Sequence, residues 1–258
     1  MFATIINDCH CPNARGRQET RVASLLNCPT NFIQVDSDLE ASGNLVDALD
    51  AGLGREGVIL VNVAPRNGEA QKWENGSPFA YFYYQKTLVI STISGHNLSL
   101  VKKIDLAKEI KVVNLKGTVE KNLPKKKDYL SQTQFRSFEF TPRLATWILE
   151  GKDIKNEIKD IQEIPDLGAL VWCVDNFGNI KTTVLAGTEE ERQLKEKLDQ
   201  AGFESSPKLK DVSEKKPALI TGSSGIEENR FLEIVINGKN ASKDLGINIG
   251  DDLDKLGF

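Results

Sequence analysis

The first 65 residues alternate between short apolar runs and stretches with helical spacing, and this alternation constrains the fold more than any other feature. Three runs have the character of buried strands: ATIIND (3–8), NFIQVDS (31–37) and EGVILVNVAP (56–65). The stretches between them, 13–27 and 42–54, carry apolar residues at helical spacing. This order is typical of a parallel sheet covered by helices. Such a sheet binds ligands at the carboxyl ends of its strands, where Asp8 stands.

The rest of the chain predicts a second, different architecture. FAYFYY and KTLVIST read as a hairpin, and FTPRLATWILEG as a helix with Thr141 as its cap, which completes a first domain over residues 1–160. From Leu167 the chain consists of extended runs separated by glycine. The predicted fold is therefore α/β. A parallel or mixed sheet covered by helices comes first, followed by a smaller, mainly β, barrel-like domain over 167–258 with a helical and loop insertion at 188–216.

Composition excludes several classes of protein. The formal charge of −4 gives no overall electrostatic reason to bind nucleic acid or an anionic membrane, and KNLPKKK (121–127) is expected to be a solvated loop. No apolar run has the length of a membrane span, and the first ten residues lack the features of a secretory signal. We therefore expect a cytoplasmic protein without nucleic-acid or membrane partners.

Four cysteines, Cys9, Cys11, Cys28 and Cys173, lack a repeated C-x-x-C spacing. This pattern favours reduced thiols over a disulfide framework or a metal site. An alternative remains open, in which Cys9, His10 and Cys11 join Cys28 around a metal ion, because thiolates and imidazole are good zinc ligands.

The stretch VDNFGNIKTT (174–183) lies between two extended runs and combines groups suited to a nucleoside. Asp175 offers a carboxylate for an ammonium or hydroxyl group, and Phe177 offers a flat apolar face. Gly178 permits close backbone approach, and Asn179 supplies a donor and an acceptor. The alternative is that the turn only joins two strands, as Asx-Gly turns often do.

A second glycine-bearing turn, GSSG (222–225), presents serine hydroxyls and backbone amides that can hold a carboxylate or phosphate. It is followed by LEIVINGKNASKDLGINIGD. This order of motifs resembles the carboxyl-terminal domain of the S-adenosylmethionine hydroxide adenosyltransferases, a family that includes the S-adenosylmethionine-dependent fluorinase and chlorinase. The resemblance is strong over about the last third of the chain and collinear over the remainder.

The resemblance implies a ligand and an assembly. Family members bind S-adenosylmethionine between the α/β domain of one subunit and the β domain of its neighbour, usually in a trimer, so we expect a homotrimer with a small nucleoside ligand. No cofactor is expected besides S-adenosylmethionine as substrate or ligand. The implied contacts are Asp8 with the ribose hydroxyls, Asp175 with the methionine ammonium, Phe177 and Asn179 with adenine, and Ser223 or Ser224 with the methionine carboxylate.

The sequence departs from the family where water would be activated. Ala64 stands at the position of the family's aspartate and Arg136 at that of its histidine. A guanidinium stays protonated and cannot act as a general base. Arg66 and Lys72 are candidates for the family's arginine, and Ser137 lies in the loop where fluorinase-like members have a halide-contacting serine.

The functional prediction is a divergent S-adenosylmethionine hydroxide adenosyltransferase-like protein that binds S-adenosylmethionine or another adenosine compound at a subunit interface. The alternative is an active enzyme with rearranged catalytic groups, either a hydrolase that forms adenosine and methionine or a halogenase. No catalytic residue is assigned, the candidates being Arg136, Ser137 and Arg66. His10 or His96 could serve as a replacement base. A purely structural paralogue with a filled pocket is a third hypothesis.

Overall fold

The structure is a computed structural model that describes residues 1–63 and 76–255. It divides into two compact units, Met1–Asp166 and Leu167–Phe258, here called the amino-terminal and carboxyl-terminal units. Each unit has its own sheet and its own buried cluster of apolar side chains. The two units are therefore described separately.

The amino-terminal unit is built on a seven-stranded sheet with the order β2-β1-β3-β5-β4-β6-β7. Its strands are β1 (Phe2–Asn7), β2 (Thr30–Gln34), β3 (Gly57–Asn62), β4 (Phe79–Tyr84), β5 (Thr87–Thr92), β6 (Glu109–Val113) and β7 (Asn156–Asp160). β1 pairs in parallel with β2 and β3, and β3 pairs in parallel with β5. β4 runs antiparallel to β5 as the predicted hairpin, so the sheet is mixed.

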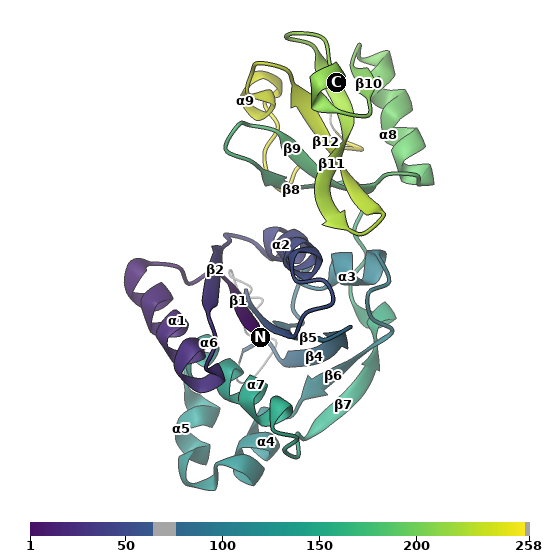
Figure 1. The fold of residues 1–258 in the computed structure, drawn as a ribbon. Coiled ribbons are helices and arrows are strands. Elements are labelled where there is room, and N and C mark those ends of the chain that lie inside the picture. The colour runs from purple at the N-terminus through teal and green to yellow at the C-terminus, as the bar shows by residue number, and fades with distance from the viewer. Residues whose placement is uncertain (64–75, 256–258) are drawn as a thin grey trace. The chain divides into compact units, whose positions relative to one another are not determined.

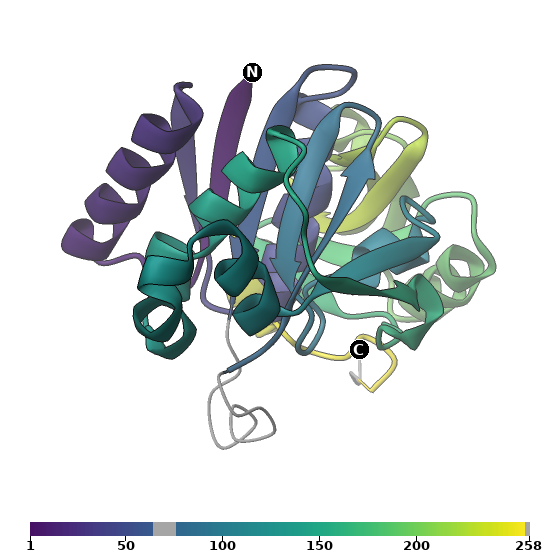
Figure 2. The same ribbon diagram turned by 90° about the horizontal axis from the view of Figure 1, so that it is seen from below.

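Helices cover both faces of this sheet (Figure 1). The described helices are α1 (Pro12–Leu26), α2 (Asp38–Ala51), α3 (Ser99–Lys103), α4 (Leu115–Asn122), η2 (Pro124–Lys126), α5 (Lys127–Gln132), α6 (Arg136–Glu139), α7 (Thr141–Leu149) and η3 (Ile161–Glu163). α1 and α7 pack together on one face, while α2 and α3 cover the other. Figure 2 shows the strands side by side between these two helical layers. The predicted α/β class is confirmed.

Two local predictions in this unit were wrong. Thr141 does not cap α7: its hydroxyl donates to the Ser137 carbonyl, and Phe140 holds the cap position. The basic stretch 121–127 is not a plain loop, because it contains the end of α4, the 3-10 turn η2 and the start of α5. Val119 and Leu130, on either side of the lysines, are fully buried, and this apolar anchoring makes the segment helical.

The carboxyl-terminal unit is a five-stranded sheet with the order β10-β11-β12-β9-β8. Its elements are β8 (Val171–Val174), β9 (Ile180–Leu185), α8 (Glu189–Gln200), β10 (Glu204–Ser206), η4 (Leu209–Asp211), β11 (Pro217–Ile226), β12 (Asn229–Ile236) and α9 (Ala241–Leu245). β10 and β8 lie at opposite edges, and no pairing between them closes a barrel within the described residues. The β-rich unit is thus an open sheet with helices α8 and α9 added.

Two features of this unit differ from the extended pattern read in the sequence. The segment 241–245 is helical because Asn240 accepts a hydrogen bond from the Lys243 amide and Gly246 takes the left-handed conformation that ends a helix. The segment 204–216, expected to be part of the helical and loop insertion, contributes the strand β10, which pairs in parallel with β11. Among the helices in both described ranges, none combines the length and apolar character needed to cross a bilayer.

Candidate functional site

The turn between β8 and β9 is organised by the carboxylate of Asp175. Its Oδ1 accepts hydrogen bonds from the backbone amides of Phe177, at 2.8 Å, and Asn179, at 2.9 Å. Its Oδ2 accepts the side-chain amide of Asn179 at 2.9 Å. An ionised carboxylate has about four acceptor directions, so roughly one remains open on Oδ2. The same bonds orient the Asn179 amide, because its Nδ2 must face Asp175 and its Oδ1 must point away.

Gly178 fixes this turn against the start of α9. Its φ of +89° lies in the left-handed region that favours glycine, and a Cβ there would overlap the Asn240 side chain. The Gly178 carbonyl also accepts a hydrogen bond from the Ser242 amide at 3.0 Å. Asn240 in turn caps α9. The turn and the helix N-terminus therefore hold each other in place.

A pocket of about 510 Å³ opens beside this turn. It is lined by Phe177, Asn179, Leu209, Ile236, Gly238, Lys239 and Asn240. The ring of Phe177 is 71% exposed and the Leu209 side chain 40% exposed, so the pocket has apolar surface open to a ligand. Leu209 lies in η4, within the predicted insertion, and sequence reasoning missed it because nothing in SSPKLKDV marks one leucine as a pocket wall.

The serine turn lies in β11, where the register with β12 shifts between Thr221 and Gly225. Ser223 is exposed, whereas Ser224 is buried and its Oγ accepts a hydrogen bond of 2.5 Å from Lys181 Nζ. The Lys181 ammonium also lies 5.4 Å from the ring centroid of Trp172. The indole Nε1 of Trp172 is buried without a hydrogen-bond acceptor in the described part of the chain. Lys181 therefore brings an ammonium group to the serine turn, which suits an anion.

In the amino-terminal unit, polar residues collect at the carboxyl edge of the sheet. Asp8 directly follows β1 and is partly buried. His10, in the same loop, makes a 2.9 Å contact through Nε2 with Oδ1 of Asp36, which follows the neighbouring strand β2. The second histidine, His96, contacts the Ser99 hydroxyl through Nδ1 at 3.2 Å. The structure thus pairs one of the two histidines with a carboxylate.

Arg136 is anchored at this same edge. Its Nη1 donates to the Ser77 carbonyl at 2.7 Å, and its guanidinium lies 4.9 Å from the Phe79 ring centroid at the start of β4. The first residue of β4 pairs with the last residue of β5, which places Ser77 beyond the carboxyl end of β5. Burial lowers the pKa of the Arg136 guanidinium. Arg66 and Lys72, the other basic candidates, lie outside the described residues.

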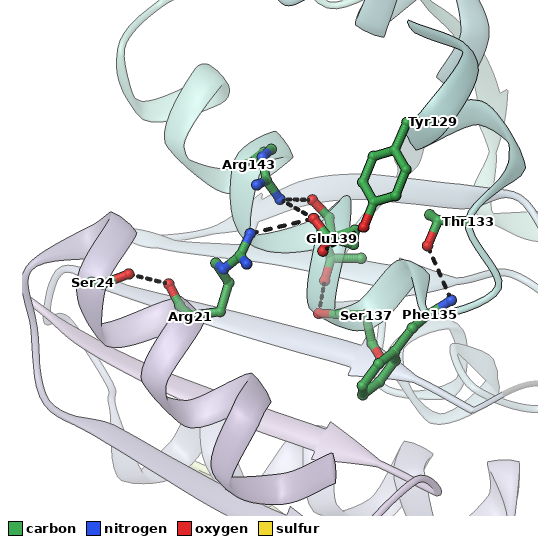
Figure 3. A network of polar contacts seen from close by, with 9 residues as sticks. Arg21, Ser24, Tyr129, Thr133, Phe135, Ser137, Glu139 and Arg143 are labelled. Carbon is green, nitrogen blue, oxygen red and sulfur yellow. Dashed lines mark hydrogen bonds and ion pairs between the residues drawn. The ribbon is translucent and has the colours of Figure 1, made fainter. Parts of the chain in front are cut away.

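The short helix α6, which carries Arg136 and Ser137, is held by a charged cluster (Figure 3). Glu139 is 7% exposed, and its Oε2 accepts hydrogen bonds from Arg143 at 2.8 Å and Arg21 at 3.3 Å. Its Oε1 accepts the Tyr129 hydroxyl at 3.0 Å, and this hydrogen bond raises the pKa of Tyr129. Ser137 is buried in the same short helix. The cluster ties α1 to α6 and α7 and so fixes the position of α6.

The cysteines of the amino-terminal unit differ in their exposure. Cys9 and Cys11 are exposed, and Cys28 packs against the apolar core, where burial raises the pKa of its thiol. Across the described residues, no three His, Cys, Asp or Glu side chains are placed to hold a metal ion.

Comparison with solved structures identifies the fold. The chain is similar to an uncharacterized conserved protein from Thermotoga maritima, with a TM-score of 0.65, 15% identity and coverage of 97% of this chain and 98% of that one. It is also similar to a conserved hypothetical protein from Thermus thermophilus, with a TM-score of 0.55, 14% identity and 96% coverage of both chains. At these identities the likeness shows a shared α/β fold alone. Among curated protein sequences, no relative matches the chain.

A comparison with protein-family models gives a second finding, which concerns the carboxyl-terminal unit. Residues 169–254 match the family model of the SAM hydroxide adenosyltransferase C-terminal domain, where SAM is S-adenosylmethionine. The match covers nearly the whole carboxyl-terminal unit, including the turn at Asp175, the serine turn and the pocket lining. The resemblance read from the sequence is thereby confirmed over this unit.

Proposed function

We propose that the protein binds S-adenosylmethionine or another adenosine compound, with adenine in the pocket beside Phe177. The pocket is proposed to be completed by a neighbouring copy of the chain in a homotrimer. The observation that carries the proposal is that Phe177 and Asn179 line one pocket of about 510 Å³, a volume within the range of ligand sites, roughly 300–1,000 Å³. The family match over residues 169–254 supports the choice of ligand.

The orientation of Asn179 supports adenine among the purines. Nδ2 of Asn179 donates one of its two N–H groups to Asp175, so the amide oxygen and the second N–H remain for a ligand. This acceptor and donor match the exocyclic amine and the adjacent ring nitrogen of adenine, whereas hypoxanthine presents the opposite pattern, a carbonyl and an N–H. Phe177 supplies a face on which the ring can stack, and Leu209 supplies an apolar wall.

The remaining parts of S-adenosylmethionine have chemically suitable partners in the same unit. The acceptor direction left on Asp175 suits the methionine ammonium. The Lys181 ammonium beside Ser224 suits the methionine carboxylate. The resemblance assigned the serines to this group but gave no role to Lys181.

The proposal does not include hydrolysis by the groups that the family uses. Arg136 occupies the position of the family's histidine, and its guanidinium donates to a carbonyl and contacts an aromatic ring. Such a group can attract an anion but cannot remove a proton from water.

Isothermal titration calorimetry with S-adenosylmethionine, adenosine, inosine and methionine tests the proposal. Binding of S-adenosylmethionine and adenosine, with inosine weaker than adenosine, is the expected result. If neither S-adenosylmethionine nor adenosine produces heat of binding, the proposal is refuted. Analytical ultracentrifugation of the same samples tests the trimer.

Replacing Phe177 with alanine is expected to weaken adenosine binding about tenfold, because the purine loses its stacking surface. The dissociation constant from calorimetry is the measurement. Tyr83→Ala provides the control, since Tyr83 is an aromatic residue 50% exposed on the amino-terminal unit. An equal loss in both variants, or none in Phe177→Ala, would place the adenine elsewhere.

Lys181→Met is expected to weaken S-adenosylmethionine binding by roughly ten- to a hundredfold, because a charge-assisted hydrogen bond to the carboxylate is lost. Methionine keeps an unbranched stem that can pack on Trp172. Adenosine, which lacks a carboxylate, is the matched control ligand and should bind with unchanged affinity. If the affinity for both ligands falls by the same factor, Lys181 has only a structural role.

A further inference from the structure

The strand β7 forms one outer edge of the seven-stranded sheet. It is the last strand of the sheet, next to β6, and among the described residues no strand pairs with its outer side (Figure 1). Its residues, Asn156–Asp160, are exposed except for Lys159, which is half-buried. Ile158, an apolar side chain at the centre of this edge, is 58% exposed. An exposed edge strand with an apolar centre is a template for pairing with a strand of another chain.

The hydrogen bonds between β6 and β7 determine which backbone groups of β7 point outward. The strands are antiparallel, and at one end of the ladder the Asn114 amide donates to the Lys155 carbonyl. At the other end the Ile161 amide donates to the Lys108 carbonyl. Hydrogen-bonded pairs alternate along an antiparallel ladder, so every odd-numbered residue of β7 directs its N–H and C=O groups toward β6. The groups that point outward belong to the even-numbered residues Asn156, Ile158 and Asp160.

We propose that β7 pairs with β7 of a second copy of this chain, in the antiparallel direction and about a two-fold axis at Ile158. In this register Ile158 lies opposite Ile158 of the second copy, and Asn156 lies opposite Asp160. Every outward-facing residue therefore meets another outward-facing residue, and such pairs exchange both of their backbone hydrogen bonds. The inference concerns the amino-terminal unit and does not depend on the proposed nucleoside pocket.

The charges of β7 complement one another in this register. Glu157 lies opposite Lys159 of the second copy, and the two-fold symmetry forms the same pair a second time. Both are non-hydrogen-bonded pairs, in which side chains come closest, and opposite charges across strands stabilise the pairing.

Other registers fit less well. A shift of one residue would place outward-facing backbone groups opposite groups that are already bonded to β6. A shift of two residues would place Glu157 opposite Glu157, or Lys159 opposite Lys159, depending on its direction. Like charges directly opposite each other destabilise a strand pair. The backbone and the side chains therefore specify the same register.

The pairing is expected to be weak and to depend on protein concentration. A pair of short strands buries less surface than the roughly 1,200 Å² at which stable interfaces begin. Lys159 also contacts Oε2 of Glu163 within its own chain at 3.1 Å, so its ammonium is shared between two carboxylates. We therefore expect a dissociation constant in the micromolar range.

The other sheet edges suit self-pairing less well. β2, at the opposite edge of the same sheet, carries no charged side chain that would specify a register. In the carboxyl-terminal unit, the Val171 amide donates to the Asp251 carbonyl and its carbonyl accepts the Gly250 amide, so the outer side of β8 is occupied there. β10 has only three residues. At β7, both the backbone and the charges fit a second copy.

Analytical ultracentrifugation of the full-length chain over a range of concentrations tests the pairing. Wild type is expected to double its molecular mass as the concentration rises, whether the smaller particle is a single chain or the proposed trimer. Glu157→Lys and Lys159→Glu should each raise the dissociation constant roughly tenfold or more, because each replaces both opposite-charge pairs with like-charge pairs. Lys155→Glu is the matched control, since Lys155 is exposed and lies opposite the apolar Ile161 in the proposed register. It should keep the wild-type constant.

Mixing the two variants gives the sharpest test. The Glu157→Lys edge carries two lysines and the Lys159→Glu edge carries two glutamates, so the two edges complement each other. The mixture is expected to associate with close to the wild-type dissociation constant. The double variant, with both substitutions in one chain, should pair with itself. Neither recovery would occur if the single substitutions acted by disturbing the fold.

The outcomes bear on this inference separately from the nucleoside pocket. If the mass of wild type does not double at concentrations up to about 0.5 mM, the pairing is refuted. Doubling that persists in both single variants, or a mixture that fails to associate, would show that another surface joins the copies. The affinity for adenosine should be the same in all these variants, because none of the substituted residues lines the pocket beside Phe177.

Discussion

Replacing Glu139 with alanine is expected to lower the free energy of unfolding by about 3 kcal/mol, because removing one member of a buried ion pair leaves its partners uncompensated. Glu139 is almost fully buried and joins Arg21 and Arg143. The side chains of these arginines are 24% and 15% exposed, so water compensates them only in part. Chemical denaturation followed by circular dichroism measures the loss.

Glu19→Ala is the matched control for this prediction. Glu19 also pairs with an arginine of α1, Arg15, at the same 3.3 Å separation that joins Arg21 to Glu139. The Arg15 side chain is 50% exposed, so this pair should contribute at most about 1 kcal/mol. Equal losses in the two variants would show that burial does not set the strength of the Glu139 cluster.

Glu139→Gln should also lower the pKa of Tyr129, because the charged acceptor that raises it is gone.

Gly178→Ala is expected to destabilise the carboxyl-terminal unit by roughly 2–3 kcal/mol and to weaken adenosine binding, through strain and loss of a helix cap. The new Cβ would overlap the side chain of Asn240, so Asn240 must move. Its movement would break the bond to the Lys243 amide that caps α9. Asn240 lines the pocket and Gly178 lies between two residues that line it, so the pocket would change shape as well.

Gly187→Ala separates the clash from the backbone strain. Gly187 has a φ of +80°, close to that of Gly178, but a Cβ there meets nothing within 4 Å. Alanine at Gly187 should cost only the conformational strain, about 1 kcal/mol. Thermal unfolding and calorimetry with adenosine, performed on both variants, give the comparison. If both variants lose the same stability and keep their affinity for adenosine, Asn240 can move away from the new Cβ without affecting the helix cap or the pocket.

The sequence predicted the α/β fold where its signals are local. The alternation of apolar runs with helical spacing in the first 65 residues predicted β1, α1, β2, α2 and β3, because burial enforces that period. The helical structure of the segment 121–127 was missed because the segment itself is rich in lysine. The buried residues that anchor it, Val119 and Leu130, lie outside it. The open form of the second sheet follows from which strands pair, which a run of apolar residues cannot specify.

In the candidate site, too, the residues that are close in sequence were predicted, and those brought together by the fold were missed. Asp175, Phe177 and Asn179 stand within five residues of one another, so their types and spacing alone were enough to mark the turn. Leu209 was missed because only the folded chain brings it to the pocket that Phe177 also lines. The contact of Asp36 with His10 was missed for the same reason. Such contacts depend on the topology. Whether the ligand contacts implied by the resemblance exist stays a prediction.

The three hydrogen bonds that end on the Asp175 carboxylate have a consequence for the thermodynamics of recognition. They order the turn through its own atoms, so its conformational entropy is lost during folding and not when a nucleoside arrives. If the turn binds the proposed nucleoside, a surface that is ordered in advance favours rapid, rigid docking over induced fit. Differences in affinity among adenosine analogues should then arise from their direct contacts with the turn, without a contribution from rearrangement of the turn.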